Sequence, residues 1–244
     1  LVIDKNGDGR PDQFALPNAE DVFVIPLNGG KGGWIKDGKP LEPVQRFKDT
    51  LSLIAKMRKA GIDAQFPPWS GEWINSFKED AAVTMFAGCW MGGFFKEWMC
   101  PELSGDWRVD YPPGKTYASD GGSFLAVPEQ TPESHRRAAW EVIKYISTSR
   151  EGQLLLLESI NAFPALTTIF NDPEITAPAE YFGGQRIGEI YRDIALNIPV
   201  QKVTEYDAVA VDLFRLAIRA VLLDGKSIDE AYNSAKAELS NYLK

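Results

Sequence analysis

The sequence predicts an α/β fold, and three observations support this prediction. Short apolar segments bounded by glycine, proline and asparagine alternate with longer segments of helical periodicity along the chain. The 244 residues are 44% hydrophobic, so the chain can bury a sizeable core without disulfides. The last two expected helices carry clear boundary signals, because Gly225 ends one and Ser227 begins the next.

The first half of the chain is expected to combine short strands with two helices. Asp37 and Gly38 favour a tight hairpin turn. Apolar residues from Val44 to Met57 recur at helical spacing until Gly61 stops the pattern. The expected elements are, in order, a strand at 14–16, an apolar segment at 22–27, the hairpin at 34–39, a helix over 44–57, a helix over 73–78 and a strand over 82–86.

The second half is expected to be mainly helical. Ser227 and Glu230 form a capping-box pattern, and an apolar stripe follows it at helical spacing. The expected elements are, in order, strands at 107–110 and 123–127, helices at 132–147 and 149–159, a helix within 178–200 that ends before Pro199, a helix over 206–223 and a helix from 227 onward.

The composition excludes several function classes. Acidic residues outnumber basic ones, 34 to 26, and no Lys/Arg cluster is present, which argues against nucleic acid as a partner. No apolar run is long enough to span a membrane. The single histidine, His135, lies near the start of an expected surface helix, so a catalytic triad or a zinc cluster would need unusual substitutes. A pair of catalytic carboxylates stays open.

Two cysteines, Cys89 and Cys100, lie eleven positions apart. On a continuous helix their α-carbons would be about 16 Å apart, whereas a disulfide needs them within about 7 Å. A bridge would therefore require a bend at Gly92 and Gly93 or at Pro101. The spacing favours two buried free thiols over a bridge.

Residues 4–12 resemble a calcium-binding loop. Oxygen-bearing side chains recur at alternate positions, and Gly9 permits a sharp turn. The position of the usual bidentate glutamate is occupied by Ala15, so any calcium affinity is expected to be weak. The alternative is an ordinary turn rich in Asp and Asn. No other cofactor is expected, and the candidate ligands are Asp4, Asn6, Asp8, Arg10 and Asp12.

A series of segments resembles, in order and spacing, the extracellular sugar-binding proteins of ABC importers, the maltose-binding-protein-like family. Two positions depart from the family pattern: Asp80 stands where a glycine is usual, and Cys89 where Ser, Asn or Pro is usual. The similar segments are Phe77 to Trp90, Asp106 to Gly114, Gly121 to Pro128, Ala138 to Ile146, Ser149 to Gln153, Phe163 to Ala165 and Leu223 to Ala231.

The resemblance implies a periplasmic-binding-protein-like fold of type II that lacks most of its N-terminal lobe. Residues 1–122 and 172–244 would belong to the C-terminal lobe, and residues 123–171 to a segment that returns to the N-terminal lobe. It further implies a non-enzymatic, extracytoplasmic receptor, periplasmic or a cell-surface lipoprotein. Such a receptor delivers a sugar to permease subunits and reaches the membrane only through them or through a lipid anchor outside this chain.

The resemblance also implies a set of ligand-binding residues. Trp90 matches a tryptophan that stacks on sugar, and Glu20 with Phe23 matches a sugar-bonding acid with a nearby aromatic; core packing or plain surface is the alternative for each. The stripe of Phe94, Phe95, Trp98 and Met99 is expected to be helix core. Further candidates are Asp120, Gly121 and Gly122 at an expected hinge crossing, the loop and helix residues Trp69 and Trp73, and Tyr206.

Three function classes follow. The favoured one is a receptor for a carbohydrate, with the 11% aromatic content favouring an oligosaccharide. The first alternative is a carbohydrate-active hydrolase that uses two carboxylates. The second is a calcium-dependent interaction module built around residues 4–12.

Overall fold

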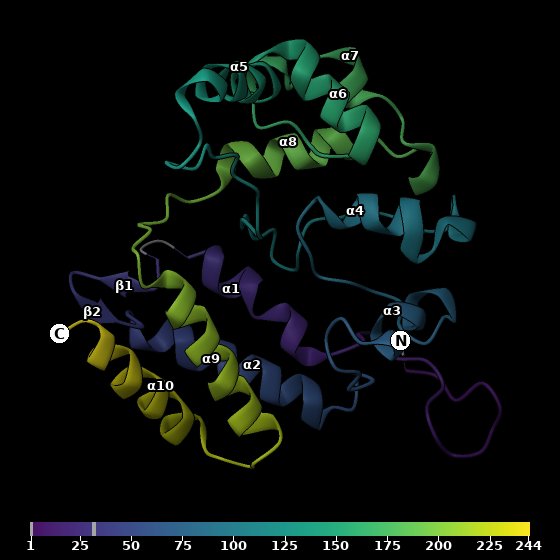
Figure 1. Ribbon diagram of the computed structural model, residues 1–244. Coiled ribbons are helices and arrows are strands. Elements are labelled where there is room, and N and C mark those ends of the chain that lie inside the picture. The colour runs from purple at the N-terminus through teal and green to yellow at the C-terminus, as the bar shows by residue number, and fades with distance from the viewer. Residues whose placement is uncertain (1, 31–32) are drawn as a thin grey trace. The chain divides into compact units, whose positions relative to one another are not determined.

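The computed structural model describes residues 2–30 and 33–244, which divide into two units (Figure 1). The chain passes from one unit to the other after Phe86, Tyr111, Asp120 and Leu196. Unit 1 comprises Leu1–Phe86, Pro112–Asp120 and Asn197–Lys244, and unit 2 comprises Ala87–Tyr111 and Gly121–Leu196. The assignment of 1–122, 123–171 and 172–244 to family lobes stays a prediction.

Unit 1 is built on three long helices that pack against one another, α2 (Val44–Lys59), α9 (Asp207–Leu222) and α10 (Ile228–Tyr242) (Figure 1). Phe214 of α9 lies at the centre of their interface, with ring centroids 5.6 Å from Phe47 and 5.8 Å from Trp34. These side chains belong to one buried core. The shorter helices of this unit are η1 (Ala19–Val22), α1 (Val24–Asn28) and α3 (Gly71–Lys78).

Helix α10 begins where the capping box predicts. The Ser227 hydroxyl accepts a hydrogen bond from the Glu230 backbone N–H, and the Glu230 carboxylate accepts one from the Ser227 backbone N–H at 3.0 Å. The apolar stripe behind this cap is buried at Ala231, Ala235 and Leu239. The expected helices at 44–57, 73–78 and 206–223 are also confirmed.

Regular strand structure is limited to one hairpin, among the residues described, and the expected hairpin is confirmed as β1 (Ile35–Lys36) with β2 (Lys39–Pro40). Expected strands at 14–16 and 82–86 are reduced to isolated parallel bridges, Phe14 with Ala82 and Leu16 with Asp63. The expectation was wrong in extent because only a few backbone groups find partners there before the segments diverge. The apolar segment at 22–27 is helical.

The backbone conformation of Asp80 shows why an aspartate can stand where the family usually has glycine. Its backbone is left-handed, with φ of 58°, a conformation that glycine adopts most readily and Asp tolerates. Its carboxylate pairs with Lys5 at 2.6 Å. The turn therefore keeps its backbone shape without the usual glycine.

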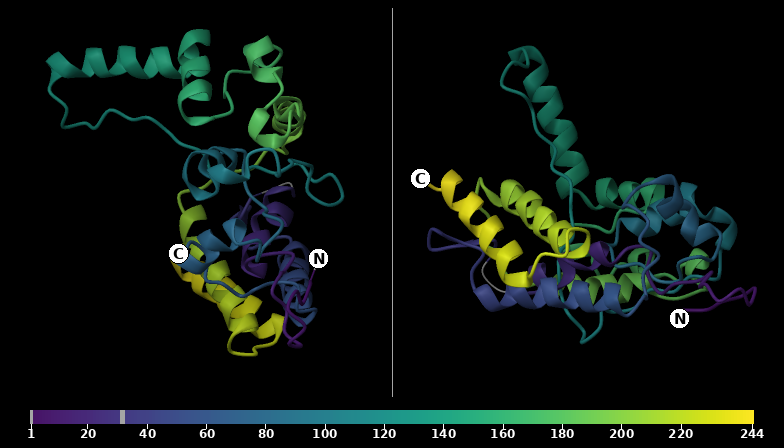
Figure 2. Two further views of the ribbon diagram at one scale, coloured as in Figure 1. Left: turned by 90° about the vertical axis from the view of Figure 1, so that its right-hand side faces the viewer. Right: turned by 90° about the horizontal axis from the view of Figure 1, so that it is seen from below.

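Unit 2 is helical throughout its regular structure, in the portion described. The predicted helices at 132–147 and 149–159 are confirmed as α5 (Glu133–Thr148) and α6 (Arg150–Ile160), which pack on each other. Figure 2 shows α5 extending away from the other helices of its unit, and no residue of α5 is buried. The remaining elements are α4 (Met91–Phe94), η2 (Phe95–Met99), η3 (Pro101–Leu103), η4 (Thr167–Ile169), α7 (Pro173–Thr176), η5 (Glu180–Phe182) and α8 (Ile187–Asn197).

The two strands expected in unit 2 are wrong. Neither 107–110 nor 123–127 forms regular structure, and Phe124, expected to be buried, is 99% exposed. A strand is stable only when a neighbouring strand satisfies its backbone hydrogen bonds. No second strand lies beside these segments within the described part of unit 2.

Both cysteines are free, as the spacing favours. Cys100 is buried and lies 3.3 Å from the Tyr181 hydroxyl, which itself donates to the Cys100 carbonyl at 2.7 Å. Cys89 is only half-buried, so the expected burial is confirmed for Cys100 alone. None of the helices described is both long enough and apolar enough to span a membrane.

Candidate functional site

Trp90 lies at the N-terminal end of α4 and is half-buried. A Cβ added at Gly121 would come within 3.2 Å of the Trp90 indole nitrogen, and the Gly121 backbone has φ of 72°. Both facts require glycine at this position, since a side chain would be strained and would press on the ring. The structure therefore brings together two of the residues that the resemblance implies for ligand binding.

The aromatic stripe beside Trp90 divides between two faces. Phe95 and Met99 are buried at 4% and 3% exposure, which confirms the expected core positions. Phe94 and Trp98 are 38% and 50% exposed, so the expectation of a core role is wrong for these two. The reason is geometric: neighbouring positions on a helix point in different directions, and only one face turns into the unit.

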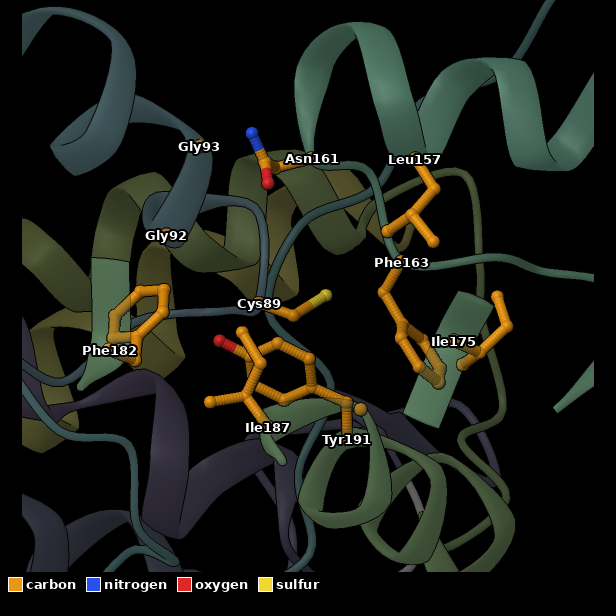
Figure 3. A pocket seen from close by; sticks show the side chains of 11 residues that line it. Cys89, Gly92, Gly93, Leu157, Asn161, Phe163, Ile175, Phe182, Ile187 and Tyr191 are labelled. Atoms are coloured by element: carbon orange, nitrogen blue, oxygen red, sulfur yellow. The ribbon is translucent and has the colours of Figure 1, made fainter. Parts of the chain in front are cut away.

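Unit 2 contains a small pocket, which is lined by residues that include Cys89, Gly92, Phe163 and Tyr191 (Figure 3). Its volume of about 50 Å³ is far below the roughly 300–1,000 Å³ of ordinary small-ligand sites. Gly92 and Gly93 permit close packing here, because a Cβ at Gly93 would meet the Ile160 carbonyl oxygen at 2.7 Å. Burial raises the pKa of the Tyr191 phenol in the same wall. The pocket supports the packing of α4 and is too small for a sugar.

In unit 1, Trp69 and Trp73 form a stacked pair with ring centroids 5.0 Å apart. Trp73 is 1% exposed and belongs to the core, and its indole N–H donates to the Asp21 carboxylate at 2.8 Å. Trp69 is 48% exposed, with a left-handed backbone at φ of 66° that is unusual for a bulky residue. Trp69 is therefore the accessible member of the pair, and strained backbone of this kind gathers at functional sites.

Glu20 is 7% exposed within η1, directly before Asp21. Its carboxylate oxygens each lie 3.5 Å from a guanidinium nitrogen of Arg219, which orients the acid. Burial raises the pKa of Asp21 to about 7, with the neighbouring charges of Glu20 and Asp63 adding to the effect. The hydrogen bond from Trp73 opposes this rise.

Phe23 is 3% exposed and packs in the core of unit 1, with its ring centroid 6.4 Å from that of Phe214. The guanidinium carbon of Arg215 lies 5.3 Å from the Phe23 centroid. Phe23, Trp73 and Glu20 are thus buried, which leaves Trp69 as the exposed member of this group.

Tyr206 precedes α9 and lines an open pocket of about 360 Å³ with Lys202, Glu205 and Leu243. None of the other candidate ligand residues lines this pocket. The structure therefore separates Tyr206 from the group around Glu20.

Asp120 is half-buried and closes the short segment 112–120 of unit 1. The Asn28 amide donates to the carbonyl of the preceding residue, Ser119, at 2.7 Å, which ties this segment to α1. Gly121 is the first residue of unit 2, and Gly122 follows it with φ of 130°. The chain thus passes from unit 1 to unit 2 between Asp120 and Gly121, and a hinge role for these residues stays a prediction.

The loop at residues 4–12 is exposed, and its side-chain oxygens accept hydrogen bonds from its own backbone. Asp4 accepts from Gly7 and Gly9 at 2.6 and 2.8 Å, and these bonds lower its pKa. Asp12 accepts from the Lys5 amide at 2.8 Å. Within 2–30 and 33–244, no group of three or more His, Cys, Asp or Glu residues is arranged to hold a metal ion. Calcium binding stays a prediction.

Sequence reasoning missed three features of these groups. Arg219 pairs with Glu20 across 199 positions of the chain, and no local pattern signals such a contact. Asp21 directly follows the candidate Glu20, and two adjacent carboxylates are a signal that could have marked it as a site residue. Phe94 and Trp98 share a four-residue spacing with Trp90, which is the signal that places all three on one helix face.

Helices packed around short parallel strand contacts, in two units between which the chain crosses repeatedly, define an α/β fold of the periplasmic-binding-protein type. The chain belongs to the family of bacterial extracellular solute-binding proteins, whose family model matches residues 7–183. A search of curated protein sequences finds no match.

Solved structures support the same fold. The chain resembles the sugar-binding protein MalE of Xanthomonas citri (17% identity, TM-score 0.74, 95% of this chain and 58% of the other). It also resembles an ABC transporter associated binding protein of B. animalis subsp. lactis in complex with β-1,6-galactobiose (19%, 0.73, 95% and 62%). A third is the maltose/maltodextrin-binding domain MalE of Bdellovibrio bacteriovorus bound to maltotriose (23%, 0.69, 100% and 63%). The chain spans about 60% of the length of these relatives.

Proposed function

We propose that this chain forms the sugar-binding part of a receptor that delivers a carbohydrate to an ABC importer. The observation that carries the proposal is the half-buried Trp90 ring held against the Gly121 backbone. The apolar face of a pyranose stacks on such a ring, and a bare glycine backbone lets sugar hydroxyls approach amide groups. The receptor binds its sugar without chemical turnover.

Unit 1, taken by itself, carries side chains of similar chemistry. Trp69 presents an exposed ring whose position is fixed by stacking on Trp73. Glu20 and Arg219 form a planar acceptor and a planar donor that suit sugar hydroxyls. An aromatic face together with a few oriented polar groups is the usual composition of a small-ligand site.

The proposed partners are the permease subunits of the importer. Among the solved relatives, one is described as the sugar-binding protein MalE and another as an ABC transporter associated binding protein. The family is extracellular by its description, and we place this receptor in the periplasm or on the cell surface as a lipoprotein.

The proposal is tested by isothermal titration of the chain with glucose, maltotriose and β-1,6-galactobiose at millimolar concentrations. We expect at least one of these sugars, or another member of a wider panel, to bind. Trp90→Ala should weaken that binding about tenfold or more with little change in the unfolding midpoint. Trp140→Ala is the matched control, because Trp140 is an exposed tryptophan of the same unit on α5.

Two results would contradict the proposal. Binding that is unchanged in Trp90→Ala removes this ring from the site, and a complete lack of sugar binding removes the receptor function. Release of reducing sugar from an oligosaccharide, abolished by Glu20→Gln or Asp21→Asn, would instead favour the hydrolase alternative.

A further inference from the structure

Three aromatic side chains form a connected series along α4 and η2. The ring centroids of Trp90 and Phe94 lie 5.6 Å apart, and those of Phe94 and Trp98 lie 5.7 Å apart. Both pairs meet edge to face, at interplanar angles of 85° and 72°. We call this series, Trp90, Phe94 and Trp98, the aromatic ladder.

Two of the three ladder rings are exposed, whereas the large apolar side chains on the opposite face of the segment are buried. Phe94 is 38% and Trp98 50% exposed, while Met91, Phe95 and Met99 on the other face are each 4% exposed or less. Phe94 and Trp98 are therefore not core residues of unit 2. A contiguous run of exposed large aromatics is uncommon on a protein surface and marks a binding face.

The backbone beneath the ladder is anchored firmly. Residues 95–99 form a π-helical turn, closed by a 3.1 Å hydrogen bond from the Cys100 N–H to the Phe95 carbonyl. Phe95 packs on Trp107 with ring centroids 4.7 Å apart, which fixes the inner side of this turn. Single π-helical turns are rare and occur frequently at functional sites. The outer rings are thus presented on a rigid support.

Polar groups flank the ladder. The Glu97 carboxylate accepts a hydrogen bond from the Asn161 amide at 3.2 Å and pairs with Lys96 at 3.4 Å. Asn161 ends α6 in a left-handed conformation, so its amide comes from a separate helix. Exposed aromatic faces beside oriented carboxylate and amide groups match the two-sided chemistry of sugars, which are apolar on the ring face and polar at the rim.

We propose that the aromatic ladder binds successive sugar units of one oligosaccharide, with Phe94 and Trp98 as subsites beyond Trp90. This inference rests on the proposed sugar-receptor function and adds chain-length selectivity to it. The separation of neighbouring rings is comparable to the length of one pyranose unit. A monosaccharide therefore contacts the ladder at Trp90 alone, whereas a trisaccharide reaches Trp98.

The test measures affinity against chain length in four variants. The probes are glucose, maltose, maltotriose and maltotetraose, with a matching galactose series if the wild type prefers galactosides. Trp98→Ala should lower the affinity for the trisaccharide and tetrasaccharide about tenfold and leave the monosaccharide affinity unchanged. Phe94→Ala should act from the disaccharide upward, and Trp90→Ala on every length. Trp140→Ala should change none of them.

Two further measurements keep the result interpretable. Far-UV circular dichroism and the unfolding midpoint verify that each variant folds, and Trp98→Phe should retain most of the affinity for long sugars because it keeps an aromatic face. The oligomeric state of the wild type and Trp98→Ala is measured by sedimentation.

Each outcome separates the inference from the function on which it rests. If the wild type binds sugar and Trp90→Ala weakens it, while Phe94→Ala and Trp98→Ala bind every length normally, the ladder inference is wrong and the receptor function stands. If Trp98→Ala alters self-association without altering sugar affinity, the ladder is a protein contact and the inference is overturned. If the wild type binds no sugar, the receptor function fails first.

Discussion

The indole N–H of Trp73 donates a 2.8 Å hydrogen bond to the Asp21 carboxylate within unit 1. Burial raises the pKa of this carboxyl to about 7, and the charges of Glu20 and Asp63 add to the rise. The bond joins an ionisable group to Trp73, whose ring packs against that of Trp69 with centroids 5.0 Å apart. Protonation of Asp21 and the packing of these tryptophans are therefore physically coupled.

The first prediction concerns pH. Because the Asp21 pKa is about 7 in the folded chain and near 3.8 when unfolded, the folded state holds the extra proton between these values. The stability that this proton supplies is fully present below about pH 4 and is lost as the pH rises through about 7, by up to about 4 kcal/mol. Asp21→Asn keeps an acceptor for Trp73 and should remove this part of the decline.

Chemical denaturation of wild type and Asp21→Asn from pH 4 to pH 8 checks this expectation. The variant should be the more stable protein at pH 8 and should differ least at pH 4. Asp224→Asn, at an exposed carboxyl, is the control and should follow the wild type. Parallel pH profiles for all three proteins would refute the coupling.

The second prediction concerns the contact between Gly121 and Trp90. Gly121→Ala should destabilise unit 2 by about 1–2 kcal/mol, from a left-handed backbone with φ of 72° and a methyl group 3.2 Å from the indole nitrogen. It should also shift the tryptophan fluorescence. Gly114→Ala is a matched control, because φ is 75° there and no atom lies within 4 Å of an added Cβ. Equal effects of the two substitutions on fluorescence would show that the Trp90 contact is unimportant.

The third prediction concerns the loop at residues 4–12. If it binds calcium, saturating Ca²⁺ should raise the unfolding midpoint, with about 2.7 kcal/mol of stabilisation at one hundred times the dissociation constant. The doubly substituted variant Asp4→Asn with Asp12→Asn should lose this response, while Asp229→Asn, on α10, should retain it. No shift with Ca²⁺ over an EDTA-treated sample would identify the loop as an ordinary turn whose carboxylates bind its own amides.

The fourth prediction concerns the start of α10. Ser227→Ala removes the hydroxyl that accepts from the Glu230 backbone N–H, which is the side-chain half of the capping box, and should cost about 1 kcal/mol of unfolding free energy. Ser240→Ala, near the other end of the same helix, removes a hydroxyl that bonds only to the Lys236 carbonyl and should cost less. A denaturant titration that ranks the two variants in the opposite order would contradict the importance of the cap.

The long helices could be predicted from the sequence, and the strands could not. Helices such as α2 and α10 satisfy their backbone hydrogen bonds internally, so periodicity and caps within one segment are sufficient evidence. The segment 123–127 has an apolar strand pattern but no neighbouring strand in the described part of unit 2, and Phe124 is left exposed. An apolar strand pattern forms a strand only when another segment of the chain lies beside it and pairs with its backbone N–H and C=O groups.

For the candidate site, too, one part could be predicted from the sequence and another could not. Trp90 and Gly121 could be chosen as candidate ligand residues from the family-like segments, and the structure places them next to each other. The face on which Phe94 and Trp98 lie was misjudged, because a periodic aromatic stripe does not say which of its sides turns inward.

The sequence by itself determined the α/β class, the long helices with their caps and the resemblance to sugar-binding receptors, and it favoured free cysteines over a bridge, because these depend on residues that are close together in the chain. Only the tertiary structure decided that Glu20 is paired with Arg219, that Trp73 is buried beneath an exposed Trp69, and that the aromatic ladder faces outward. The physical reason is that burial and electrostatic pairing are set by what packs against a side chain, and those neighbours come from distant parts of the sequence.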